Sequence, residues 1–90
     1  MRAPSIMQKE KECYISGSKQ MLDLHHVYPG AYRKASDQTG CWVWLRHDIH
    51  MDLHQRNTEL LKRIQRETQE EFEKRFGHDE FMRIFRKSFL

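Results

Sequence analysis

The order of patterns along the chain predicts a small α+β fold in which two strands precede three helices. Residues 21–27 and 41–45 are short stretches rich in apolar, β-branched and aromatic side chains, which is typical of strands. From residue 48 onward, apolar side chains recur every three or four positions, which is typical of helices. We therefore expect a two-stranded unit at the front of the chain and a helical second half.

The first half of the chain contains both expected strands. Residues 1–12 are polar, carry charges of both signs and are interpreted as an N-terminal arm. Pro29 and Gly30 end the first strand, because proline cannot donate a ladder hydrogen bond and glycine permits a turn. Residues 31–40 are expected to form a polar connection. A connection of this length between neighbouring strands favours an antiparallel pair.

The second half is expected to be helical. A short helix begins at Asp48, Asn57 is a good N-cap for a long helix over 58–76, and Gly77 is placed to end that helix. A last short helix is expected over 79–87. The apolar side chains of the long helix are expected to pack on the strand that carries the two tryptophans or on the last helix, and the C-terminal helices are a candidate homodimer interface. These apolar residues are Leu60, Leu61, Ile64, Phe72 and Phe76.

Length and composition limit the function classes. The 90 residues are enough for one domain but not for a Rossmann unit or a barrel. There is neither an apolar run of about 18 residues nor a signal-peptide pattern, so neither a membrane span nor export is expected. The two cysteines are too few for a disulfide framework and fit a reduced, intracellular compartment. The net charge of +3 permits nucleic-acid binding.

Histidines are the most unusual feature, because five of the six lie between positions 25 and 54. His50 and His54 are four residues apart on a predicted helix, so their imidazoles are neighbours and can bind one metal ion. The alternative is a pair of surface histidines. Adjacent strand residues point to opposite sides, so either His25 or His26 can face the helix as a third ligand. Three imidazoles leave coordination positions open for water and phosphate.

The histidine that faces away from the metal is free to act as a general base, because the ordinary imidazole pKa of about 6.5 lies close to neutral pH. A base and a cation on two sides of a phosphodiester form a hydrolytic site. We therefore expect one divalent metal ion: zinc, nickel, manganese or magnesium. Magnesium fits three imidazoles less well than the others because it prefers oxygen ligands.

Two segments resemble the HNH endonucleases, which are also called ββα-metal or His-Me finger nucleases. The first segment is LHHVYP at 24–29, and the second is RHDIHMDLHQR at 46–56. The second is similar to the corresponding part of colicin DNase domains, and the overall spacing is similar to that of small HNH proteins of phages and prophages. The resemblance extends from about residue 13 to the end. It implies a ββα-metal core over 13–56 with a helical extension over 57–90.

The resemblance also implies a role for each of four histidines. His25, His50 and His54 would bind the metal. His26 would be the general base that accepts a proton from the attacking water during DNA hydrolysis. The similarity to phage and prophage proteins implies that the chain acts in the cytoplasm of a bacterial host cell.

The sequence differs from the family pattern at two places. The family's middle asparagine, which orients the base, falls on Cys41. Of the four cysteines with which many relatives bind a structural zinc, only Cys13 is present. These differences favour an alternative, a non-catalytic His-Me finger that binds nucleic acid or protein and keeps the fold and the metal.

Basic residues flank the expected site and are candidates for contacts with DNA phosphates. They are Arg33, Lys34, Arg46 and Arg56. The alternative for all of them is an ordinary solvated surface. Trp42 and Trp44 are interpreted as core residues rather than as a platform on which bases stack.

Overall fold

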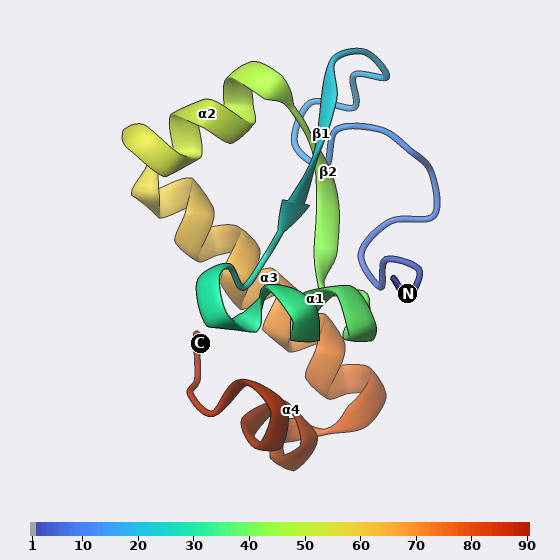
Figure 1. Ribbon diagram of the computed structural model, residues 1–90, viewed down its shortest axis with the longest axis vertical. Helices are drawn as coiled ribbons and strands as arrows, with labels where there is room; N and C mark the ends of the chain where they lie inside the picture. The colour runs from blue at the N-terminus through green and yellow to red at the C-terminus, as the bar shows by residue number, and fades with distance from the viewer. Residues whose placement is uncertain (1) are drawn as a thin grey trace.

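The chain folds around a two-stranded antiparallel sheet (Figure 1). The computed structural model describes residues 2–90. Strand β1, Leu22–His26, pairs with strand β2, Trp42–Arg46, so that the last residue of β1 lies opposite the first residue of β2. Both strands agree with their predicted ranges to within one residue at each end.

Helices follow the sheet, as predicted. They are α2, His47–Gln55, α3, Thr58–Phe76, and α4, His78–Phe85. Asn57 caps α3, because its Oδ1 accepts a hydrogen bond from the backbone N–H of Leu60 at 3.0 Å. The predicted α+β class is confirmed. No helix within residues 2–90 is both long and apolar enough to cross a membrane.

The connection between the strands differs from its predicted structure. Instead of a polar connection without secondary structure, a 3-10 turn at Gly30–Tyr32 leads into helix α1, Arg33–Thr39. Ser36 of α1 is buried, and its hydroxyl donates to the carbonyl of Tyr28 at 3.1 Å. A helix that is held by polar contacts of this kind has no hydrophobic period, so its sequence looks like a loop.

Residues 2–12, the predicted N-terminal arm, contain no helix or strand but are not frayed, while Met1 lies outside the described residues. The indole N–H of Trp42 donates to the carbonyl of Ala3 at 2.8 Å, and the backbone N–H of Trp44 donates to Oε1 of Gln8 at 2.8 Å. The segment therefore lies along the edge of β2 that β1 leaves unpaired, where it covers exposed strand hydrogen-bonding groups. Figure 1 shows it on the side of the sheet away from α2.

The core lies on the face of β2 that carries Val43 and Leu45. Val43 and Leu45 are fully buried there, together with Ile64 of α3. Phe72, also of α3, packs on α4, with its ring centroid 5.5 Å from that of Phe81. These contacts confirm the predicted packing of α3 on the last helix.

One detail of the predicted packing is wrong, because Phe76, near the end of α3, is 56% exposed. The rings of Trp42 and Trp44 pack edge to face, 5.6 Å apart, next to the N-terminal segment. The homodimer interface expected through the C-terminal helices stays a prediction.

Candidate metal centre

His25 is the buried centre of the candidate site. It is 2% exposed, and its Nε2 is a buried atom without a hydrogen-bond partner among the described residues. An unsatisfied polar atom in a protein interior costs about 1–3 kcal/mol. This atom therefore requires a ligand or some other explanation.

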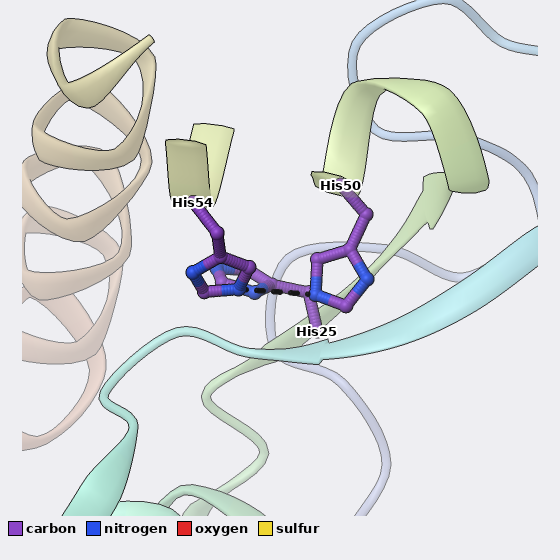
Figure 2. A group of neighbouring side chains, drawn as sticks. All are labelled: His25, His50 and His54. Carbon is purple, nitrogen blue, oxygen red and sulfur yellow. Dashed lines mark hydrogen bonds between the residues drawn. The ribbon is translucent and has the colours of Figure 1, made fainter. Parts of the chain in front are cut away.

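Two further imidazoles meet His25. His50 and His54 lie one turn apart on α2, and Figure 2 shows their rings approaching the ring that rises from β1. Their ring centroids are 5.2 Å and 5.6 Å from that of His25. One nitrogen of each ring can be chosen so that all three lie within 4.8 Å of one another. The sequence prediction that these three side chains come together is confirmed.

The spacing of the nitrogens fits a metal ion. Nε2 of His50 and Nε2 of His54 are 3.3 Å apart. Two imidazole nitrogens that bind one tetrahedral zinc at about 2.0–2.1 Å are themselves about 3.3 Å apart. The triad, in which His25 is buried, His50 half-buried and His54 exposed, could therefore hold a metal ion.

Burial and neighbouring charges favour the neutral forms of His25 and His54. Burial, reinforced by the neighbouring His50 and His54, lowers the pKa of His25 to about 3. Burial and His50 also lower the pKa of His54. Neutral imidazoles keep the lone pairs that a metal ion needs, whereas protonated imidazoles would repel it.

Asp23 orients His50 from behind. Its Oδ2 lies 3.0 Å from Nδ1 of His50 and 2.7 Å from Nδ1 of His47. The hydrogen bond with His50 lowers the pKa of Asp23, so the carboxylate is ionised and can only accept. Nδ1 of His50 therefore carries the hydrogen, and its Nε2 directs a lone pair toward the triad. Carboxylate–histidine pairs of this kind fix metal ligands in many proteins.

His26 lies on the opposite face of β1, as strand alternation predicts. Its Nε2 is 2.9 Å from Oδ1 of Asp37 on α1. Arg2 donates to the same oxygen at 2.9 Å, and this hydrogen bond lowers the pKa of Asp37. Since an ionised carboxylate can only accept, Nε2 of His26 carries a hydrogen, and in the neutral form of the ring the lone pair is on Nδ1.

One pocket of about 250 Å³ at the end of β1 is lined by residues from both faces of the strand. It is lined by His25, His50 and His54, by His26, and by Leu24, Pro29 and Arg33. The candidate ligands and the candidate base therefore border the same space.

The four predicted phosphate contacts differ in their surroundings. Arg33 lines the pocket and has no ion pair within residues 2–90. Arg46 forms two hydrogen bonds with Asp48, at 2.7 Å and 2.6 Å. Lys34 and Arg56 are exposed but do not line the pocket. Arg33 is thus the basic residue best placed to hold a phosphate.

The cysteines lie away from this chemistry. Cys41 is fully buried, and burial raises the pKa of its thiol to about 11, which makes it a poor nucleophile. Cys13 is also buried, and its Sγ accepts the backbone N–H of Ser16 at 3.4 Å. Both side chains are packing residues in this structure.

Asp37 was not identified from the sequence as the partner of His26. No sequence pattern pointed to it, because it lies in a polar stretch 11 residues from His26.

Comparisons of the chain with models of protein families, with curated proteins and with solved structures found no match. The function is therefore inferred from the chemistry of the site.

Proposed function

We propose that the protein is a metal-dependent endonuclease of the HNH type, which hydrolyses DNA phosphodiester bonds in the cytoplasm of a bacterial host. One observation carries the proposal: a triad of imidazoles and a separately held histidine border the same pocket. A module that only binds metal has no need of a fourth histidine, His26, beside the three of the triad.

His25, His50 and His54 would hold a divalent ion, and the unpartnered Nε2 of His25 is the atom that such an ion would satisfy. The bound ion would supply positive charge to the phosphate and to the leaving oxygen. Zinc, nickel and manganese fit three imidazoles better than magnesium does.

His26 would act as the general base. Its Nδ1 accepts a proton from the water whose oxygen attacks phosphorus, while the bond between phosphorus and the leaving oxygen breaks. Asp37 holds the ring by Nε2 and stabilises the positive charge that His26 then carries. Arg33, at the rim of the pocket, would bind a non-bridging phosphate oxygen and position the scissile bond.

A plasmid-nicking assay with zinc, nickel, manganese and magnesium tests the proposal. His26→Ala should lower cleavage by about 10²–10⁴-fold and leave metal binding intact. His54→Ala should lose both, because it removes a ligand. His78→Ala is the matched control, since His78 pairs with Glu73 and does not line the pocket.

The second candidate function is a non-catalytic module with the same fold. The buried thiol of Cys41 favours it, because this side chain cannot orient a base in the pocket. A chain that binds metal and DNA but nicks no plasmid with any of the four ions would support this second candidate. Cleavage by His26→Ala at the parent rate would reject the mechanism.

A further inference from the structure

A groove of about 520 Å³ lies between α3 and the segment that follows α4. On one side it is lined by Lys62, Gln65 and Arg66 of α3. On the other side it is lined by Lys87, Ser88, Phe89 and Leu90. We call it the basic groove, because its lining includes Lys62, Arg66 and Lys87 and, among the described residues, no acidic side chain.

The cations of the basic groove are mostly unpaired. Among residues 2–90, Arg66 and Lys87 have no ion pair, and Lys62 has only a long contact of 3.9 Å with the exposed Glu59. Other arginines of α3 have close carboxylate partners, Arg63 with Glu67 at 3.1 Å and Arg75 with Glu71 at 2.7 Å. The unpaired positive charges of α3 therefore include that of Arg66, which lines the basic groove.

The groove also has a fixed shape. Lys87 places its Nζ 5.0 Å from the ring centroid of Phe89, and that ring packs 4.6 Å from the ring of the buried Tyr28. The segment after α4 is thereby anchored to the core, so its lysine is presented beside α3 rather than on a free tail.

The basic groove adjoins the pocket that is lined by His25, His26, His50 and His54, which we call the histidine pocket. Gln65, which lines the groove, donates to the carbonyl of Val27 at 3.3 Å and accepts at its own carbonyl from the hydroxyl of Tyr28 at 2.7 Å. Val27 directly follows His26, and Pro29, which follows Tyr28, lines the histidine pocket. The short turn after β1 thus separates the two sites. Figure 1 shows the C-terminal segment beside the start of α1, from which Arg33 reaches the pocket.

We propose that the basic groove binds the phosphate backbone of duplex DNA next to the bond that is cut. This inference rests on the proposed nuclease function for the identity of the ligand. Phosphates on one side of the scissile bond would contact Arg33, and those further along would contact Arg66, Lys62 and Lys87. Such contacts position a duplex without reading its sequence.

The test is DNA binding measured by fluorescence anisotropy, with a labelled duplex, in EDTA, so that no metal-dependent cleavage occurs. The groove variant replaces Lys62, Arg66 and Lys87 with serine. The matched control replaces Lys9, Lys19 and Lys74 with serine; these lysines are exposed and have no ion pair within residues 2–90. Both variants have three fewer positive charges than the parent, so they differ in the position of the charge rather than in its amount. Circular dichroism melts verify that both fold.

The groove variant should bind at least about tenfold more weakly than the control. The slope of log affinity against log salt should fall by about 1 for each phosphate that the variant no longer binds. Equal affinities and equal slopes for the two variants would overturn the proposal. Tighter binding of the parent to phosphatidylserine vesicles or to polyglutamate than to DNA would overturn it as well.

Failure of the groove and failure of the nuclease give different results. If the parent nicks plasmid but the groove variant binds DNA like the control, only the groove proposal is rejected. If the parent nicks nothing but the groove variant alone loses binding, the groove proposal is supported and the nuclease is rejected.

Discussion

Asp23 holds Nδ1 of His50 at 3.0 Å and so ties strand β1 to helix α2 through a side chain that does not itself belong to the triad. The contact decides which ring nitrogen of His50 is available. Its consequence for metal binding can be measured directly.

Replacing Asp23 by asparagine should weaken metal binding by about 10–100-fold, because the charge that fixes the ring of His50 is removed. The dissociation constant is measured by competition with a coloured chelator. Asp48→Asn is the control, since Asp48 is an exposed carboxylate that pairs with Arg46 and not with the triad. Equal affinities for the two variants would show that Asp23 does not position His50.

The metal-free protein should lose stability as the pH falls below about 6.5. The pKa of His25 is about 3 in the folded chain, against an ordinary value of 6.5. Below pH 6.5 the unfolded chain therefore takes up a proton that the folded chain does not accept until about pH 3. At pH 5 this residue should contribute a loss of about 2 kcal/mol relative to pH 7.

Urea denaturation in EDTA at several pH values measures this effect. The comparison is with His25→Leu, which cannot titrate at this position, and only the pH dependence of the two chains is compared. A parent and a variant whose stabilities change in parallel between pH 7 and pH 5 would contradict the assignment.

Replacing Gly40 by alanine should destabilise the fold by more than about 1 kcal/mol. Gly40 has a φ of +78°, and a Cβ there would collide with the backbone oxygen of Pro4. Gly30→Ala is a matched control, because its φ is +69° but no atom lies within 4 Å of the added Cβ. The difference between their urea midpoints isolates the contact with the N-terminal segment. Equal losses would mean that the segment moves aside without cost.

Replacing Cys41 by asparagine should destabilise the chain without raising cleavage. The side chain is fully buried, and an amide at this position would bury polar groups, each costing about 1–3 kcal/mol if unpaired. Cys41→Ala, which introduces no polar group, should be tolerated better. Stability is measured by thermal melting and activity by plasmid nicking. A stable Cys41→Asn protein with faster nicking would show instead that the position can orient the base.

Much of the fold follows from local sequence signals. Helix α3 has a capping asparagine, a regular apolar spacing and a glycine at its end, and these signals agree with one another. Helix α1 has only the last of them, Gly40, and lacks both a capping side chain at its start and a regular apolar spacing. It is stabilised by hydrogen bonds outside the helix, such as those of Ser36 with Tyr28, and no pattern within 33–39 reports them.

The site was predictable to a similar extent. The i, i+4 pair His50 and His54 is a local signal, and strand alternation separates His25 from His26. The partners of these histidines are set by the folded arrangement of β1, α1 and α2. Asp37 holds His26 only because α1 forms, so its role cannot be found while residues 31–40 are taken for a connection.

The burial of His25 also has a kinetic consequence. Its Nε2 has almost no contact with solvent, whereas the side chain of His54 is exposed. An incoming ion should therefore bind His54 and His50 first and reach Nε2 of His25 in a second step. Metal uptake should then show two phases, and only the rate of the first should increase with metal concentration.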